Sequence, residues 1–288
     1  MNGNFSDLKK RLFFSTVIVA MLVLTVYFSQ VTGMRIAISI LIATLVSLGL
    51  WEYSNMVKAK NLDIPIMLII TLSVCYIASI YFVTLSINYS VLMHFVIAVF
   101  FFAVFLFHFT RTNNAIFKLA TSFFGAFYVV IPMSLILRIL YPETTSTTLI
   151  DGRLWAAYLL AVTKFTDIGG YFTGKLWGAR KLAEEISPNK TVLGFFGGFA
   201  GAVVISFVFY LIGLNVSARY FEMTLPQSLI LGVLIGIFGQ LGDLSESLLK
   251  RDANVKDSGK IPAIGGVLDL VDSLLFTSPI VYLFLKTT

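Results

Sequence analysis

The C-terminal part of the chain combines carboxylates, cations and glycines, residue types that suit the binding of metal ions and phosphate groups. Between residues 242 and 272 the six carboxylates are Asp243, Glu246, Asp252, Asp257, Asp269 and Asp272. The four cations of the same segment are Lys250, Arg251, Lys256 and Lys260. Charge at or near membrane depth is costly and is usually kept for a function. We therefore expect the chemistry of the protein to take place here.

The spacing of these carboxylates predicts two acidic pairs. Asp243 and Glu246 are separated by three positions, with Lys250 at i+7, so they share a face of any helix that continues through them. Asp269 and Asp272 repeat this spacing at the start of the last apolar segment. A hairpin that brings the two pairs together would form an oxygen-rich pocket suited to Mg²⁺.

The cations and glycines between the two pairs suit phosphate. Lysine and arginine supply the charge that phosphate requires, and the glycines of Ser258–Gly259 and Gly265–Gly266 permit close approach of the backbone. The alternative is a solvated loop that follows the positive-inside rule. That alternative explains the cations, but it does not explain carboxylates at the ends of apolar segments.

Asp167 is a carboxylate within an apolar run, where an unpaired charge is expensive. Its partner must be Lys164, a metal ion or a polar group on another helix. Glycines 169, 170 and 174 give this run a small face for close helix packing. A structural Lys164–Asp167 pair is the alternative to a functional role.

Ser187, Lys190 and Thr191 precede a glycine-containing apolar run and could offer two hydroxyls and an ammonium to a phosphate. A capped helix start at Ser187–Pro188 explains part of this pattern equally well.

The histidines are poor candidates for a site. His94 and His108 lie among Phe and Val in one apolar run, which is typical of interior histidines. Glu52, between Trp51 and Tyr53, is interpreted as an interfacial anchor. The single cysteine, Cys75, excludes an intramolecular disulfide and a cysteine metal cluster, and we expect it to be a packed apolar residue.

These residues must be positioned by membrane helices. The 288-residue chain is 58% hydrophobic and 12% charged, whereas soluble domains carry roughly 25% charged residues. The first apolar run lacks a clear small-residue cleavage site, so we expect a spanning helix and no cleavable signal peptide. The pattern predicts an all-α polytopic protein with about nine spans, at 12–29, 34–57, 64–84, 89–109, 115–140, 153–174, 192–214, 226–249 and 267–285.

Lysine and arginine predict the orientation. With a cytoplasmic N-terminus, the inner segments hold 15 of these residues and the outer segments hold 5. The C-terminus is then outside, and a polar cavity at the acidic segment opens to the cytoplasmic face. The excess of basic residues that gives the net charge of +6 then lies at the cytoplasmic membrane surface, where anionic lipid accounts for it. No nucleic acid partner is expected. We interpret residues 1–150 as a transmembrane scaffold and residues 151–288 as the catalytic region.

The motifs together resemble the phosphatidate cytidylyltransferase family, whose members make CDP-diacylglycerol in the membrane. Matching positions near the C-terminus are Ser247, Lys250, Arg251, Lys256, Asp257, Gly259, Pro262, Gly265, Gly266, Asp269 and Asp272. Matching positions upstream include Thr166–Asp167, Tyr171–Gly174, Ser187–Pro188, Lys190–Thr191, Gly194, Gly197–Gly198, Gly242–Asp243 and Glu246. The likeness covers roughly residues 150–285, and before that it is limited to general hydropathy and the segment around Glu52.

The chain departs from the family pattern at four places. Ile264 stands where the family usually has histidine, Leu270 where it has arginine, and Leu193 where it often has Glu or Gln. The loop between Gly259 and Gly265 is one residue short. These departures remove a cation and an imidazole, while all the carboxylates are kept.

The resemblance implies transfer of CMP from CTP to phosphatidate at the inner cell membrane, with one Mg²⁺ or two metal ions. The implied metal ligands are Asp243, Asp269, Glu246 and Asp272. The implied substrate-binding residues are Lys190, Thr191, Lys250, Arg251, Ser187 and Asp167. Catalytic roles fall to Asp243, Asp269, Asp257 and Lys256. The implied partners are CTP, phosphatidate, the lipid bilayer and a second copy in a homodimer.

Three other functions remain open at this stage. A related CTP-dependent lipid kinase or nucleotidyltransferase would use the same metal pocket. A catalytically impaired paralogue would keep the carboxylates and lose turnover. A transporter is disfavoured because the charges cluster at one face and no repeat is visible.

Overall fold

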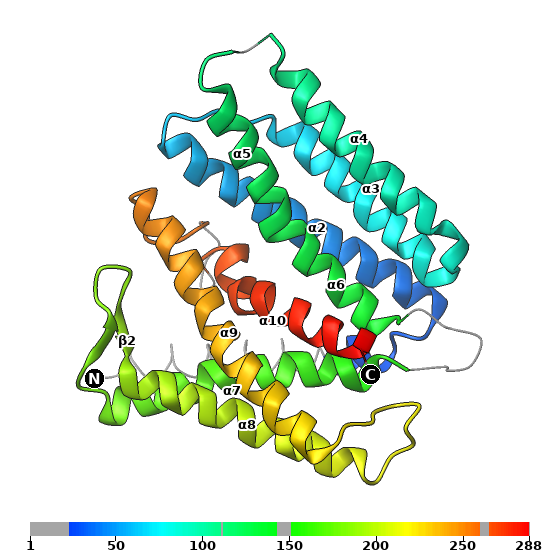
Figure 1. The fold of residues 1–288 in the computed structure, drawn as a ribbon, viewed down its shortest axis with the longest axis vertical. Helices are drawn as coiled ribbons and strands as arrows, with labels where there is room; N and C mark the ends of the chain where they lie inside the picture. The colour runs from blue at the N-terminus through cyan, green and yellow to red at the C-terminus, as the bar shows by residue number, and fades with distance from the viewer. Residues whose placement is uncertain (1–22, 111, 143–150, 260–264, 288) are drawn as a thin grey trace, which may run out of the picture.

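The computed structural model describes residues 23–110, 112–142, 151–259 and 265–287, and helices dominate them (Figure 1). The helices are α2 (Thr32–Ala59), α3 (Ile66–Leu85), α4 (Ser90–His108), α5 (Ala115–Gly125), α6 (Ile131–Leu140), α7 (Arg153–Trp177), α8 (Val192–Gly213), α9 (Leu225–Asp252) and α10 (Val267–Thr287). A 3-10 turn, Ile87–Tyr89, precedes α4, and a π-helical segment, Ala126–Val130, joins α5 to α6. The strands are β1 (Lys181–Ala183) and β2 (Ser187–Thr191).

Seven helical segments of the described chain are long and apolar enough to cross a membrane. They are Gly33–Ala59, Ile66–Leu85, Ile87–His108, Ala115–Leu140, Val192–Gly213, Leu225–Asp252 and Val267–Thr287. The expected all-α polytopic class is thereby confirmed. The predicted span 12–29 lies largely outside the described residues. The 25-residue helix α7 is long enough to span, but it carries Arg153, Lys164, Asp167 and Lys175.

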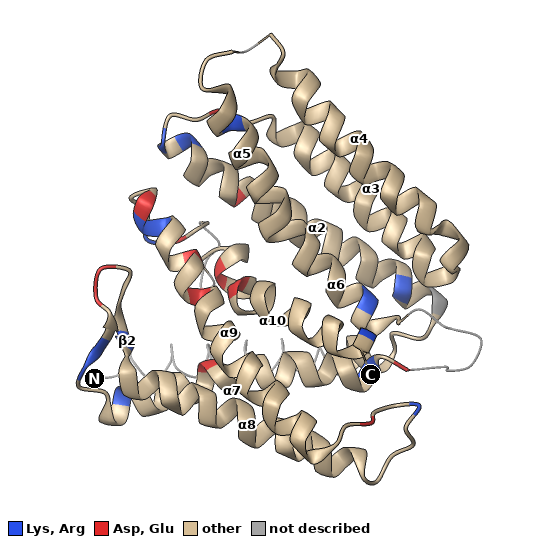
Figure 2. Cartoon of the chain, viewed as in Figure 1, with Lys and Arg blue, Asp and Glu red and all other residues tan. Residues whose placement is uncertain are grey.

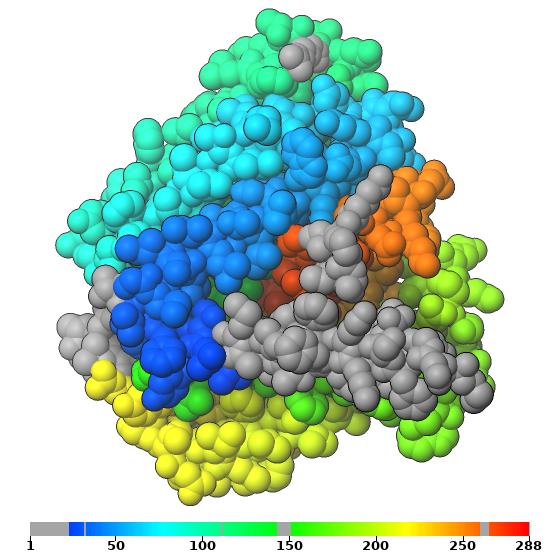
Figure 3. Space-filling view, turned by 180° about the vertical axis from the view of Figure 1, so that it is seen from behind, coloured from blue at the N-terminus to red at the C-terminus, as the bar shows by residue number. Residues whose placement is uncertain are grey.

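The helices form two groups that meet at α10. In Figure 1, α2, α3 and α4 lie along one side, while α7 and α8 lie along the other. Helix α9 packs on α8, and α10 contacts α2, α6, α7 and α9. Seen from behind, α10 shows only in a hollow between α2 and the C-terminal end of α9 (Figure 3). The last helix of the chain is therefore the element that both groups share.

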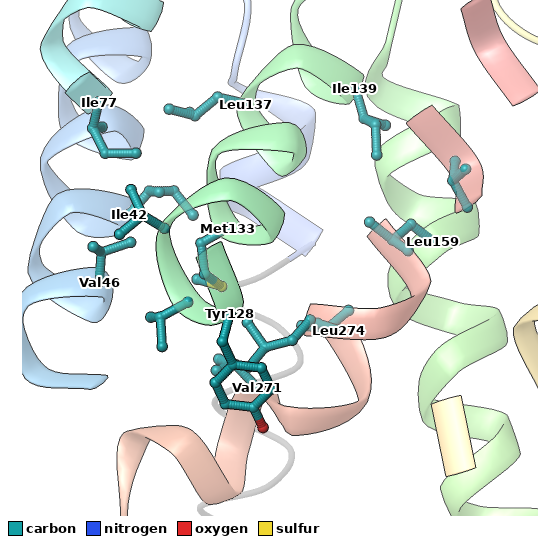
Figure 4. Close-up of a cluster of buried hydrophobic side chains, with 14 of the residues drawn as sticks. Ile42, Val46, Ile77, Tyr128, Met133, Leu137, Ile139, Leu159, Val271 and Leu274 are labelled. Carbon is teal, nitrogen blue, oxygen red and sulfur yellow. The ribbon is translucent and has the colours of Figure 1, made fainter. Parts of the chain in front are cut away.

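The core around α10 is apolar and draws on both groups. Val46 of α2, Met133 of α6, Leu159 of α7 and Val271 of α10 all belong to one buried cluster (Figure 4). Interhelical hydrogen bonds supplement it, including a 2.9 Å contact between the hydroxyls of Thr163 and Thr277. Polar pairs of this kind keep buried hydroxyls satisfied where water is absent.

Helices α7 and α8 approach so closely that only glycine fits at several contacts. A Cβ atom built on Gly169 would lie 2.5 Å from the backbone oxygen of Gly197. A Cβ atom on Gly201 would lie 2.7 Å from the backbone oxygen of Phe165. The small face that the sequence predicts on this run is thereby confirmed.

A short antiparallel hairpin stands between α7 and α8, with Lys181 opposite Thr191. The sequence reading predicted no strand. The alternative of a helix start at Ser187–Pro188 is wrong, because both residues lie in β2. The helix begins at Val192, and Thr191 caps it, accepting a 3.0 Å hydrogen bond from the backbone N–H of Gly194.

The close α7–α8 contact predicts a sharp difference between two glycine substitutions. Gly169→Ala should destabilise the protein by about 1–3 kcal/mol, because the new methyl group meets backbone that cannot rotate away. Gly33→Ala is the matched control, since a Cβ atom there meets nothing within 4 Å. The thermal unfolding midpoint in detergent checks this, and equal midpoints for both variants would contradict the close packing.

Candidate functional site

Helices α9 and α10 cross at a glycine, and this crossing builds the site. A Cβ atom on Gly242 would lie 2.5 Å from the backbone oxygen of Asp272 and 3.1 Å from the Cα atom of Ser273. The contact brings the adjacent Asp243 close to the first turns of α10. In Figure 2 the acidic positions of α7, α9 and α10, coloured red, lie near where these helices converge.

Three carboxylates from three helices form an acidic cluster, which we define as Asp167, Asp243 and Asp272. The Ser273 hydroxyl donates to Asp167 Oδ1 at 3.2 Å, and the Ser273 backbone N–H donates to Asp272 Oδ1 at 2.6 Å. Asp272 is 8% exposed and is close enough to Asp243 and Asp167 to be repelled by both. The cluster is therefore a region of concentrated negative charge.

Two lysines offset part of that charge. Lys190 Nζ lies 3.0 Å from Asp243 Oδ2, and Lys164 Nζ lies 3.5 Å from Asp167 Oδ2. Within the described parts of the chain, none of the ion pairs includes Asp272. The cluster thus keeps one more carboxylate than cations, which suits a bound divalent cation. The Lys164–Asp167 pair that the sequence offered as a structural alternative exists, but it is half-exposed and adjoins the cluster.

The other two predicted ligands surround a lysine. Lys250 Nζ lies 2.5 Å from Asp269 Oδ1 and also forms an ion pair with Glu246. The Glu246 side chain is 0% exposed, and among the described residues its carboxylate has no hydrogen-bond partner of good geometry. Asp269 Oδ2 accepts hydrogen bonds from the hydroxyl and the N–H of Ser258, at 3.0 and 3.2 Å. We call Glu246, Lys250 and Asp269 the buried triad.

The donor set fits magnesium at the acidic cluster better than at the buried triad. Within the described residues, no three His, Cys, Asp or Glu side chains converge as a complete metal cage. Mg²⁺ usually takes one or two protein carboxylates and completes its shell with water and substrate phosphates. Asp243 and Asp272 suit this way of binding Mg²⁺, because one lysine, Lys190, pairs with Asp243 and none pairs with Asp272 among the described residues. Asp269, in contrast, already forms an ion pair with Lys250 and accepts hydrogen bonds from Ser258.

A cavity of about 490 Å³ adjoins the acidic cluster. Helices α7, α8 and α9 and the hairpin line it, and the predicted residues among its lining are Asp167, Ser187, Lys190, Thr191 and Asp243. Gly170, Gly174 and Gly194 also line it, so its wall includes backbone. A volume of this size falls in the range of small-molecule sites.

The remaining predicted residues lie apart from this cavity. Lys256 and Asp257 are exposed in the segment after α9. Arg251 Nε donates to the backbone oxygen of Ile186 at 3.2 Å, which ties the end of α9 to the hairpin. Lys250 is engaged in the buried triad.

Of the three substituted positions, Leu193 and Leu270 lie among the described residues, and both are exposed. Ile264, like Pro262 and Lys260, lies outside the described residues. Leu270 is exposed, and its backbone oxygen accepts a 3.3 Å hydrogen bond from Lys164 Nζ. A lysine on α7 therefore supplies positive charge beside the position at which the family pattern has arginine.

Sequence reasoning missed two residues. Glu52 is buried and accepts hydrogen bonds from the first turn of α10, so its interpretation as an interfacial anchor is wrong. The signal was present, because Glu52, like Asp167, is a carboxylate in an apolar run. Tyr128 lies on the π-helical segment, and its buried hydroxyl has no hydrogen-bond partner in the described chain although Glu246 and Asp272 are near. No sequence pattern marks that tyrosine among so many aromatics.

The sequence matches the model of the cytidylyltransferase family over residues 9–288. A phosphatidate cytidylyltransferase from Chlamydia pneumoniae is 36% identical over 293 residues, covering 99% of this chain and 94% of that protein. One from Chlamydia trachomatis is 44% identical over 166 residues, covering 57% of this chain and 54% of that protein. One from Bacillus subtilis is 45% identical over 137 residues, covering 46% and 48%. The last two matches span about half of each relative.

The buried triad predicts an asymmetry between single and double substitutions. Lys250→Met should destabilise the protein by about 3–5 kcal/mol, because it leaves the buried carboxylate of Glu246 without a cation. Adding Glu246→Gln should recover much of that loss. The measurement is the thermal unfolding midpoint in detergent.

Lys60→Met is the control, because Lys60 pairs with Asp252 at 2.9 Å on the surface, where such pairs contribute about 0–1 kcal/mol. Strictly additive losses from Lys250→Met and Glu246→Gln would show that the two groups are not coupled as the structure has them.

Proposed function

Since the chain belongs to the cytidylyltransferase family, we propose that it is a CTP:phosphatidate cytidylyltransferase. It transfers CMP from CTP to phosphatidate and gives CDP-diacylglycerol and pyrophosphate. The observation that carries the proposal is the cavity that places the Asp243 carboxylate and the Lys190 ammonium together between membrane helices. The match to the Chlamydia pneumoniae enzyme along nearly the whole chain supports the same reaction.

In this reaction an oxygen of the lipid phosphate attacks the α-phosphorus of CTP. The new bond joins that oxygen to phosphorus, and the bond from the α-phosphorus to the bridging oxygen breaks as pyrophosphate leaves. Phosphoryl and nucleotidyl transfers depend mainly on positioning and charge neutralisation. A general base is not required, because a phosphate monoester is already anionic near neutral pH.

We assign the principal metal ligands to Asp243 and Asp272, with Asp167 beside them. The family resemblance also implied Asp269 as a metal ligand, but its contacts to Lys250 and Ser258 support a positioning role for it. When bound, Mg²⁺ neutralises phosphate charge and polarises the phosphoryl oxygens. Asp243 and Asp167 line the cavity wall, and with Asp272 beside them they would hold the metal ion there.

Lys190 is the cation best placed for phosphate. Its ammonium pairs with Asp243 and lies 3.3 Å from the backbone oxygen of Gln240, with the side chain 20% exposed to the cavity. It can exchange these partners for a phosphate oxygen without leaving the cavity. The hydroxyl of Ser187 lines the same cavity, while Thr191 supports it by capping α8.

The topology belongs to the same proposal. We propose nine spans with a cytoplasmic N-terminus, a cavity that opens to the cytoplasmic face, and residence in the inner cell membrane. The division at residue 150 into scaffold and catalytic region is also proposed, with the qualification that Glu52 contributes to α10 from the first region. Assembly as a homodimer stays a prediction.

The first test is formation of lipid-linked CMP from radiolabelled CTP, phosphatidate and Mg²⁺ in detergent. Asp243→Asn should lower the rate by about 10²–10³-fold, because it would remove a ligand of the Mg²⁺ that neutralises phosphate charge in the transition state. Asp252→Asn is the matched control, because Asp252 lies on the same helix and pairs with Lys60 at the surface.

The outcomes separate the alternatives. Equal rates in Asp243→Asn and wild type would overturn the metal assignment. Binding of CTP without product in the wild type would indicate an impaired paralogue. Product with a polyprenyl phosphate but not with phosphatidate would indicate a related lipid enzyme.

The second test concerns Lys190. Lys190→Met should raise the KM for CTP about tenfold or more, because one charge-assisted contact to phosphate contributes about 1.5–3 kcal/mol. Lys175→Met is the control, since Lys175 lines the same cavity but its ammonium is exposed and contacts the Tyr171 hydroxyl at 3.1 Å. An unchanged KM in Lys190→Met would remove Lys190 from the triphosphate site.

A further inference from the structure

Glu52 is a buried carboxylate that lies far along the chain from the site but contacts it directly. It belongs to α2 and is 7% exposed. Its Oε1 accepts a hydrogen bond from the backbone N–H of Val267 at 2.8 Å, and its Oε2 accepts one from Leu268 at 2.9 Å. These are the first two residues of α10, whose N–H groups have no partner within the helix.

The Ser258 hydroxyl joins Glu52 to the buried triad, because its single proton can be donated to either of two carboxylates. The hydroxyl of Ser258 lies 3.0 Å from Glu52 Oε2 and 3.0 Å from Asp269 Oδ2. Asp269 in turn holds Lys250, which pairs with Glu246. The contacts therefore run without a break from α2, through Ser258 and α10, to α9.

The glycines around this carboxylate show that the space is shaped for it. A Cβ atom on Gly259 would lie 2.3 Å from Glu52 Oε1, and one on Gly266 would lie 2.7 Å from Glu52 Oε2. The close backbone approach that the sequence suggested for a phosphate is made here to the Glu52 carboxylate. Any larger residue at either glycine would displace it.

Compensation of the Glu52 charge comes from hydrogen-bond donors. Across the described residues, none of the ion pairs includes Glu52. Two backbone N–H groups, one hydroxyl and the positive end of the α10 dipole stabilise the carboxylate instead. A neutral side chain of the same size would lose the attraction to these donors and to the helix dipole. The negative charge of Glu52 therefore favours the start of α10 at Val267.

We propose that Glu52 is a positioning residue for the transfer reaction. By fixing the first turn of α10, it sets the positions of Asp269 and Asp272 relative to α9. Helix α2 thereby controls the geometry of the acidic cluster, although its own side chains lie outside the cavity. The inference rests on the proposed function for its kinetic consequence, while the contact itself can be tested without turnover.

Glu52→Gln is the informative substitution. Both oxygens of Glu52 face N–H donors, so whichever way the amide turns, its nitrogen meets another donor. We expect kcat to fall about 10–100-fold and the Mg²⁺ concentration for half-maximal rate to rise, as for other residues that orient metal ligands. Ser258→Ala should show the same change to a smaller extent, because it removes the bridge to Asp269 but leaves the α10 contacts.

Tyr53→Phe is the matched control for a purely structural loss. Tyr53 is the next residue on α2, is equally buried, and donates to the backbone oxygen of Thr121 at 2.9 Å. Its removal deletes a buried hydrogen bond of the same helix without touching α10. It should lower the unfolding midpoint while leaving the Mg²⁺ dependence unchanged.

Amide hydrogen exchange measured by mass spectrometry supplies the readout that needs no activity. In Glu52→Gln, peptides containing Val267 and Leu268 should exchange faster than in wild type and in Tyr53→Phe. Unchanged exchange would overturn the contact. Faster exchange with unaltered kcat and Mg²⁺ dependence would reduce Glu52 to a structural residue and overturn its positioning role.

The same data separate this inference from the proposed function. If the wild-type protein makes no lipid-linked CMP, the proposed transfer reaction is wrong. Amide exchange at Val267 and Leu268 would still show whether Glu52 stabilises the start of α10. If Glu52→Gln does not fold, Ser258→Ala carries the kinetic measurements, and wild-type kcat and Mg²⁺ dependence in that variant would count against the inference.

Discussion

The cost of burying charge among apolar helices is the constraint on which this structure depends. Glu246 is completely buried, and Lys250 lies between it and Asp269. Removing Lys250 would leave two carboxylates without a cation in a region of low polarity. The buried triad therefore holds α9 close to α10. The two helices are so close that a glycine, Gly242, is needed where they cross.

The two carboxylates of the triad share one lysine between α9 and α10, whereas the acidic cluster adjoins a cavity. Asp272, only one helical turn beyond Asp269, points its carboxylate toward the cluster with Asp167 and Asp243. Here the carboxylates exceed the paired lysines, and a cavity adjoins them. The structure thus separates carboxylates that hold helices together from carboxylates that can hold a ligand, although both kinds have the same spacing in the sequence.

Much of the fold could be predicted because apolar length and helical spacing are local properties. The later spans, the small face of α7 and the Lys164–Asp167 pair all follow from residues near one another in the chain. The hairpin at Ser187 was missed, since four polar residues and a proline beside a glycine-rich run carry no strand signal of their own. Glu52 was misread because its partners, Val267 and Leu268, are more than two hundred positions away.

By itself the sequence determined that the chain is a helical membrane protein, and it predicts that the chemistry resides in carboxylates and cations of residues 151–288. Composition and short-range spacing are sufficient for both, since the bilayer admits few structures and leaves few reasons for charge. Only the tertiary structure decided which carboxylates pair with Lys250 and which form the acidic cluster. The pair of Lys250 with Glu246 is four positions apart on one helix, but only helix packing selects Asp269 as the second partner of Lys250 and brings Asp272 close to Asp243 and Asp167.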